Sequence, residues 1–209
     1  FLLQGQDRTV VAKPGQQVPG QARLEVKEPE RFVSRGGYKL LTALEHFALN
    51  VNGLTALDAG ASTGGFTDCL LQEGARKVYA VDVGYGQIAW TLRNDPRVVL
   101  FERTNIRHFQ GVGVEEPVDL ATIDTSFISL RHVVPPTLQF VREGGTILAL
   151  VKPQFEVGKG EVGKKGVVRD PALHLRVMGE LAAFFAELGL TVKGTCESPI
   201  TGPEGNKEF

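Results

Sequence analysis

The stretch LTALDAGASTGGFT, residues 54–67, decides the fold class of this chain. It opens with a short, mostly apolar run typical of a buried strand, and a polar turn containing three glycines follows. From Phe66 the pattern is that of a helix extending to about Glu73. A strand, a glycine-rich turn and a helix in this order predict the opening of a parallel βαβ unit. The glycines let a ligand approach the backbone, and the start of the helix offers free N–H groups.

The alternation of strand and helix continues along the chain. Strand-like runs lie at Leu54–Leu57, Lys77–Val81, Val98–Phe101, Val118–Ile123 and Thr146–Val151, with a last one at Thr191–Ser198. Helical stretches lie at Ser34–Asn50, with Ser34 as N-cap, and at Phe66–Glu73, Gln87–Arg93, Pro136–Arg142 and Pro171–Leu188, with Asp170 as N-cap. This order predicts an α/β domain with a doubly wound, Rossmann-like sheet covered on both faces. Ligands bind such sheets beyond the carboxyl ends of the strands.

The N-terminal region follows a different pattern. Arg8–Val11 and Ala22–Val26 are short β-like runs separated by Pro-Gly turns, and Lys27–Arg31 is a charged linker. This arrangement is typical of the end of a small β-containing module attached to a larger domain. The chain has no initiator Met, and Phe209 ends a segment that enters a strand, so we expect both ends to be incomplete.

The composition is that of an ordinary globular protein, and it excludes several classes. The 209 residues are 42% hydrophobic, and 23 Lys and Arg face 24 Asp and Glu, which excludes a uniformly basic coat for nucleic acid. Cys69 and Cys196 are far apart and outside any CxxC spacing, which argues against a zinc site and a disulfide framework. No run approaches the ~18 apolar residues of a membrane span, and no signal-peptide layout is present. We therefore expect a soluble, cytoplasmic protein without a metal site.

Acidic side chains follow the first two strands of the predicted sheet. Asp58 stands at the tip of the first strand, where it suits a ligand that carries an ammonium group. Asp82 follows the second strand about twenty residues later, where an acid typically accepts both ribose hydroxyls of an adenosine cofactor. A tight turn that binds nothing and a helix cap are the simpler alternatives, but the two features together favour a cofactor site.

Two further features concern an adenine ring. Residues 102–106 supply polar groups after the third strand, at the level expected for the edge of the ring. Tyr85 and Trp90 could stack on adenine or pack in the core, and we favour core packing for Trp90.

An acid and a lysine follow the next two strands. Asp124 comes directly after Val118–Ile123, and Lys152 comes directly after Thr146–Val151. Because both follow apolar runs at neighbouring strand tips, we interpret them as functional groups rather than solvated charges. A structural ion pair is the alternative.

Together these motifs resemble the S-adenosylmethionine-dependent RNA 2'-O-ribose methyltransferases of the FtsJ/RrmJ type, and among them the TlyA family, often labelled haemolysin A. The resembling segments are SRGGYKL (34–40), residues 58–67, 79–87, 102–106 and 124–129, LVKPQFEVG (150–158) and residues 202–209. The strand after Lys13-Pro14-Gly15 is similar to the end of the S4-like RNA-binding domain of these proteins. The resemblance implies the end of an S4-like domain at 1–27, a linker at 28–33 and a methyltransferase domain at 34–209 whose C-terminal strand is incomplete.

The resemblance also implies a catalytic Lys-Asp-Lys-Glu tetrad. The motifs place it on Lys39, Asp124, Lys152 and Glu208, with Glu204 as the alternative glutamate. A ribose 2'-hydroxyl must lose its proton as it attacks a sulfonium methyl group, and a lysine accepts that proton only when burial or a neighbouring cation lowers its pKa. Our hypothesis makes Lys152 the base, with Asp124 holding it and Lys39 positioning the hydroxyl.

The ligands follow from the same resemblance. The cofactor is S-adenosyl-L-methionine, with contacts assigned to Asp58, Gly60, Ala61, Ser62, Thr63, Gly64, Gly65, Phe66, Thr67, Asp82, Val83, Asn105, Ile106 and Asp124. The implied partner is ribosomal RNA in ribosomal subunits, with a cytidine ribose as acceptor. Candidate RNA contacts are Arg35, Lys159, Lys164, Lys165 and Arg169. Residues 152–169 carry five bases and two acids in a glycine-rich segment that we interpret as a mobile, phosphate-gripping loop, with a merely solvated loop as the alternative.

Three other functions compete with this interpretation. A nicotinamide-dependent oxidoreductase needs a pyrophosphate loop, and the spacing here is not GxGxxG. A membrane-damaging protein, as the haemolysin label suggests, needs a membrane span or a signal peptide. A non-catalytic RNA-binding or ribosome-assembly factor could keep the fold, although all the residue types of the tetrad are present. The oligomeric state is left open by the sequence.

Overall fold

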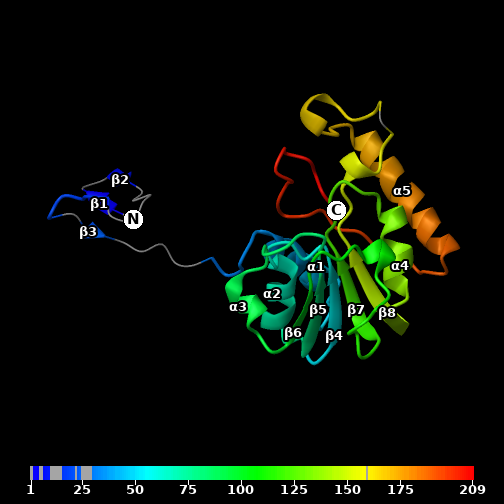
Figure 1. Ribbon diagram of the computed structural model, residues 1–209. Helices are drawn as coiled ribbons and strands as arrows, with labels where there is room; N and C mark the ends of the chain where they lie inside the picture. Colours follow the sequence, from blue (N-terminus) through cyan, green and yellow to red (C-terminus); the bar gives the residue numbers. More distant parts are fainter. Residues whose placement is uncertain (1, 5–6, 10–15, 22, 25–29, 159) are drawn as a thin grey trace. The chain divides into compact units, whose positions relative to one another are not determined.

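The computed structural model describes residues 2–4, 7–9, 16–21, 23–24, 30–158 and 160–209, and it divides into two units, residues 1–31 and 32–209 (Figure 1). In the first unit, β1 (Leu2–Gln4) pairs antiparallel with both β2 (Asp7–Thr9) and β3 (Arg23–Leu24). Both β2 and β3 overlap the predicted β-like runs. The rest of those runs and most of the predicted linker lie outside the described residues.

The second unit is built on a sheet of five parallel strands. The strands are β4 (Thr55–Ala59), β5 (Lys77–Val81), β6 (Val98–Phe101), β7 (Val118–Ile123) and β8 (Val141–Ala149), in the order β6-β5-β4-β7-β8. From β4 the chain proceeds outward through β5 to β6, and it then returns to the other side of β4 for β7 and β8. The order therefore reverses between β4 and β7, which confirms the predicted doubly wound, Rossmann-like sheet.

Helices cover both faces of this sheet. They are α1 (Gly36–His46), α2 (Gly65–Gln72), α3 (Trp90–Arg93), α4 (Val134–Leu138) and α5 (Pro171–Glu187). Side chains alternate across a strand, so Ala56 packs with α1, α2 and α3 while its neighbour Leu57 packs with α4 and α5. Asp170 caps α5 as predicted, since its Oδ1 accepts the Ala172 N–H at 2.9 Å. Among the described residues, no helix combines the length and apolar composition that a membrane span requires.

Five local predictions are wrong. Helix α1 begins at Gly36 with Arg35 as N-cap, because Ser34 Oγ lies against the backbone of Gly65 instead. Helix α4 spans Val134–Leu138 rather than residues 136–142, and β8 begins at Val141 rather than Thr146. The added residues of β8 pair with Val118 across a register shift that precedes the Leu120–Thr146 pair. Trp90 is 75% exposed, because Leu92 supplies the buried side of the short helix α3. Residues 191–198 form no strand, and Ser198 instead donates its N–H to the Glu208 carbonyl at 2.9 Å.

Candidate active site

A cavity of about 1050 Å³ lies beyond the carboxyl ends of the strands, at the switch point of the sheet. Its volume is at the upper end of small-molecule sites, which span roughly 300–1,000 Å³. Loops that follow β4, β5, β6 and β7 line it, together with Phe155 from the segment after β8. Of the predicted cofactor contacts, the lining includes Gly60, Ser62, Asp82, Val83, Asn105, Ile106 and Asp124.

The glycine turn after β4 needs its glycines for a steric reason. Gly60 has φ +89°, and a Cβ on it would lie 2.5 Å from the carbonyl oxygen of Asp124. Gly64 has φ +96° and caps the N-terminus of α2. The turn therefore brings the backbone after β4 against the backbone after β7, which a larger residue at position 60 would prevent.

Asp58 lies behind this turn rather than in the cavity lining. It is fully buried, and its carboxylate accepts the hydroxyls of Thr67 at 2.7 Å and Thr122 at 3.1 Å. Burial raises the pKa of Asp58 to about 7, against the opposing effect of these two hydroxyl groups. Asp58 thus ties β4 to α2 and β7. The other predicted turn residues outside the lining are Ala61, Thr63, Gly64, Gly65, Phe66 and Thr67.

Asp82 joins two loops of the cavity wall. Its Oδ2 accepts the Ser62 N–H at 2.7 Å, and its Oδ1 accepts the Gly84 N–H at 2.6 Å. An ionised carboxylate has about four acceptor positions, so acceptor capacity remains on the cavity side. Asp82 therefore fixes the glycine turn and remains able to bind a ligand hydroxyl.

Lys152 and Asp124 form an ion pair at neighbouring strand tips. Lys152 Nζ lies 2.6 Å from Asp124 Oδ1 and donates to Ser126 Oγ at 2.9 Å. Lys152 is only 8% exposed, while Asp124 lines the cavity. The proximity expected from the strand order is confirmed. Ser126 was not singled out from the sequence, although it stands directly beside Asp124 and Thr125 in one of the resembling segments.

A second ion pair joins Lys39 to Glu208. Lys39 is on α1, and its Nζ lies 2.5 Å from Glu208 Oε2, while Glu208 is 2% exposed. Glu204, the alternative tetrad member, is exposed. The glutamate that pairs with Lys39 is therefore Glu208 and not Glu204.

The chain end pairs with the backbone that leads into Lys152. The Val151 N–H donates to the Phe209 carbonyl at 2.7 Å, and the Phe209 N–H donates to the Val151 carbonyl at 3.0 Å. When two residues exchange both bonds in this way, the pairing is antiparallel, and the adjacent residues oppose each other with side chains on the same face. Lys152 is therefore opposite Glu208, and the C-terminus lies at the carboxyl ends of β7 and β8 (Figure 1).

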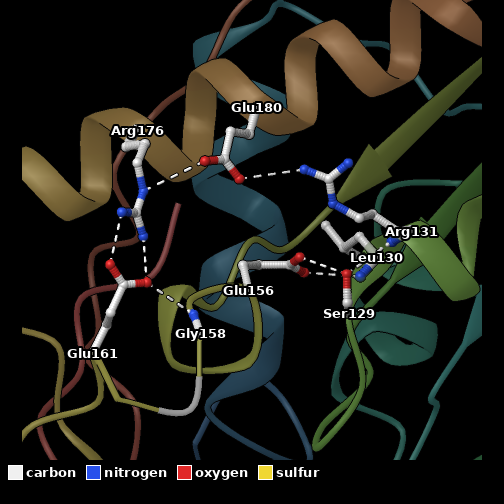
Figure 2. A network of polar contacts seen from close by, with 8 residues as sticks. All are labelled: Ser129, Leu130, Arg131, Glu156, Gly158, Glu161, Arg176 and Glu180. Carbon is white, nitrogen blue, oxygen red and sulfur yellow. Dashed lines mark hydrogen bonds and ion pairs between the residues drawn. The ribbon is translucent and has the colours of Figure 1, made fainter.

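Acidic side chains anchor the segment that follows Lys152 (Figure 2). Glu156 accepts the Ser129 hydroxyl at 2.6 Å and the Leu130 N–H at 2.8 Å, which ties this segment to the loop after β7. Burial raises the pKa of Glu156. Farther along, Glu161 accepts both terminal nitrogens of Arg176 on α5, at 2.7 and 2.5 Å.

Those of the predicted RNA contacts that the structure describes lie on the surface. Arg35, Lys164, Lys165 and Arg169 are exposed, and Lys159 lies outside the described residues. An aromatic pair that the sequence did not single out lies in the cavity wall: Phe127 is 91% exposed, and its ring centroid lies 5.1 Å from that of Phe155. His132 also lines the cavity, although no role was assigned to it from the sequence.

Comparisons with known proteins identify the family and the fold. A family model described as FtsJ-like methyltransferase matches residues 32–209. The 16S/23S rRNA (cytidine-2'-O)-methyltransferase TlyA of Mycobacterium tuberculosis is 50% identical over 205 residues, which cover 97% of this chain and 76% of that protein. A solved structure of a candidate hemolysin from Streptococcus thermophilus is 46% identical with a TM-score of 0.84, covering 94% of this chain and 72% of that one. Fibrillarin from Aeropyrum pernix, solved with bound S-adenosyl-L-methionine, shares the fold at 18% identity and a TM-score of 0.59, covering 83% and 74%.

Proposed function

Since the chain belongs to the FtsJ-like methyltransferase family, we propose that it transfers a methyl group from S-adenosyl-L-methionine to the 2'-hydroxyl of a cytidine in ribosomal RNA. The observation that carries this proposal is the buried Lys152 beside Asp124 at the edge of the cavity. The backbone bonds between Val151 and Phe209 support it, because they hold the segment of Glu208, the partner of Lys39, against the segment of Lys152.

The residues of the cavity fit the cofactor. Asp82 has acceptor capacity for ribose hydroxyls, and the glycine turn allows close approach to the backbone. Among the described residues, Thr125 Oγ1 is a buried polar atom without a hydrogen-bond partner, next to Asp124 in the wall, and it could bond to a ligand. When bound, S-adenosyl-L-methionine supplies an electrophilic methyl group on a sulfonium centre. We assign the adenosine end to Asp82 and Asn105 and the charged amino-acid end to the glycine turn.

The chain's own residues handle the proton. For this step Lys152 first releases a proton to solvent, and its neutral amine then accepts the proton that the 2'-hydroxyl loses. Asp124, at 2.6 Å, stabilises the ammonium group that forms again. Ser126 accepts a hydrogen bond from the same nitrogen and fixes its direction. Lys39, held by Glu208, positions the hydroxyl or its neighbouring phosphate. Holding the reacting groups in line supplies much of the remaining rate enhancement.

The surroundings of the site suit an RNA substrate. Arg35, Lys164, Lys165 and Arg169 are exposed cations suited to phosphates, which position a nucleic acid without reading its sequence. The three-stranded N-terminal unit is, in this proposal, part of an S4-like RNA-binding module. A ribosomal substrate also implies a cytoplasmic location.

Methyl transfer to ribosomal subunits tests the function directly. Labelled S-adenosyl-L-methionine is incubated with the protein and with isolated bacterial small or large subunits, and the modified nucleotide is mapped. The proposal expects label on a cytidine 2'-oxygen in at least one subunit. Label on a base, or no label despite tight cofactor binding, would overturn it and favour a different acceptor or an assembly role.

Replacing Asp82 with asparagine should weaken cofactor binding. The new amide group would turn a donor toward the N–H of Ser62 or Gly84, where the carboxylate now accepts both. Hydrogen bonds to charged groups contribute about 1.5–3 kcal/mol, so the Kd should rise by about one to two orders of magnitude. Isothermal titration with S-adenosyl-L-methionine measures this change. Asp95→Asn is the matched control, because Asp95 pairs with Arg97 outside the cavity lining; equal effects of both variants would contradict the assignment.

A further inference from the structure

One buried side chain links the loop at residues 163–168 to the C-terminal segment at residues 202–209. Asn206 is 3% exposed, its Oδ1 accepts the Val168 N–H at 2.9 Å, and its Nδ2 donates to the Gly166 carbonyl at 2.9 Å. The oxygen and the nitrogen of the side-chain amide thus both form hydrogen bonds with the backbone of the loop. Within its own segment, the Asn206 carbonyl accepts the Gly202 N–H at 2.9 Å.

On the loop side, Asn206 holds the turn that carries exposed cations. Lys164 and Lys165 lie in the short helical turn Lys164–Gly166, and Lys165 has φ +63°, a conformation that costs a non-glycine residue energy. The turn is closed by backbone bonds from Gly163 to Val167 and from Gly166 to Gly163, each at 3.1 Å. A phosphate bound to the two lysines would therefore pull on a turn that is anchored by the hydrogen bonds of Asn206.

On the other side, the same residue stands two positions before Glu208. The Glu208 carboxylate is fixed by Lys39 at 2.5 Å, and its backbone carbonyl accepts the Ser198 N–H at 2.9 Å. The space around this carboxylate is tight, because a Cβ on Gly202 would lie 2.8 Å from Glu208 Oε1. A shift of the segment would displace Glu208 and with it the Lys39 ammonium group.

We propose that Asn206 is a positioning residue that couples the cationic turn at Lys164 and Lys165 to the Lys39–Glu208 pair, so that an RNA backbone held by the turn sets the geometry of that pair. The inference rests on the proposed function and deepens it. An amide suits the task because one side chain offers both a donor and an acceptor, as the backbone of a neighbouring strand would. An aspartate at this position could still accept the Val168 N–H, but its second oxygen would lie against the Gly166 carbonyl, where two acceptors repel each other.

The coupling is tested first without catalysis, by hydrogen exchange of the folded protein. Asn206→Ala and Asn206→Asp should speed exchange both in residues 163–168 and in residues 202–209. The matched control is Arg176→Gln, which releases the loop from α5 at Glu161 but leaves Asn206 untouched. The control should speed exchange near Glu161 only. Faster exchange in the loop alone for the Asn206 variants would overturn the proposal, whether or not the protein methylates RNA.

A double-mutant cycle then separates positioning from a general loss of structure. At saturating RNA, Asn206→Ala should lower the single-turnover methyl-transfer rate by about 10²-fold, the cost typical of a misplaced catalytic group. The cofactor Kd should stay unchanged. Combined with Glu208→Gln, it should cause no further loss, because both changes disable the same pair. The coupling would be contradicted if the two rate losses multiplied in the double variant, or if Arg176→Gln lost as much rate as Asn206→Ala. An inactive wild-type protein would instead contradict the proposed function.

Discussion

Lys152→Ala should lower the single-turnover rate of methyl transfer by about 10³-fold, within the range that positioned acid–base groups contribute. The variant loses the only group we assign to take the 2'-hydroxyl proton, and it leaves Asp124 without its partner at 2.6 Å. The cofactor Kd should stay unchanged, because Lys152 does not belong to the cavity lining. Rapid-quench assays with labelled cofactor, paired with isothermal titration, measure both quantities.

Two further variants show whether Lys152 acts as a base or only as a cation. Lys152→Arg keeps the positive charge beside Asp124 but supplies a guanidinium group that does not lose its proton in proteins. It should therefore be nearly as slow as Lys152→Ala. Lys207→Ala is the matched control, since Lys207 is an exposed lysine paired with Glu197 at 2.9 Å. A fast Lys152→Arg would show that charge alone suffices, and the role of base would have to be given up.

Sequence reasoning predicted seven of the residues that line the cavity, because their positions depend on local order. A residue that directly follows a strand lies at the carboxyl end of that strand. Parallel strands bring their carboxyl ends to one edge of the sheet, where ligands bind. Asp82, Asp124 and Lys152 follow from that rule alone. The Asp124–Lys152 pair could be expected because β7 and β8 are neighbours in the sheet.

The other half of the site depends on contacts that local patterns do not encode. Lys39 and Glu208 are 169 residues apart in the chain, and only the resemblance to a family suggested that they meet. The strand predicted at residues 191–198 is absent, whereas Phe209, distant in the sequence, exchanges two backbone hydrogen bonds with Val151. Core packing was favoured for Trp90, but in a helix of four residues Leu92 already occupies the buried side.

Asp58 lies in the predicted strand, but its surroundings differ from the predicted ones. The sequence places it at the strand tip, where we expected contact with the ligand, and the structure buries it completely. The Thr122 hydroxyl lies 3.1 Å from Asp58 Oδ1 and 3.4 Å from the Leu57 carbonyl, but it has one proton for two acceptors. A protonated Asp58 would donate to Thr122 and free that hydroxyl for Leu57. The geometry therefore agrees with the raised pKa of Asp58.

The stability of the protein should consequently depend on pH through Asp58. Its pKa is about 7 in the folded chain against an ordinary value of 3.8, so between these values the folded state binds a proton that the unfolded state does not. The stabilisation is fully present below the lower pKa and is lost as pH rises through the higher one. From about pH 8 to about pH 5.5, this group should add about 2 kcal/mol to the free energy of unfolding.

Asp58→Asn should remove that contribution. Asparagine can still accept from one threonine hydroxyl and donate to the other, but it does not titrate. Urea unfolding at about pH 5.5 and about pH 8 should show the difference of about 2 kcal/mol in the wild type and its loss in the variant. Asp95→Asn should keep the wild-type difference, because Arg97 holds the pKa of Asp95 below its ordinary value and thus outside this pH range. An Asp58→Asn protein with the full wild-type pH dependence would show that another group carries it and that the buried carboxyl is ionised.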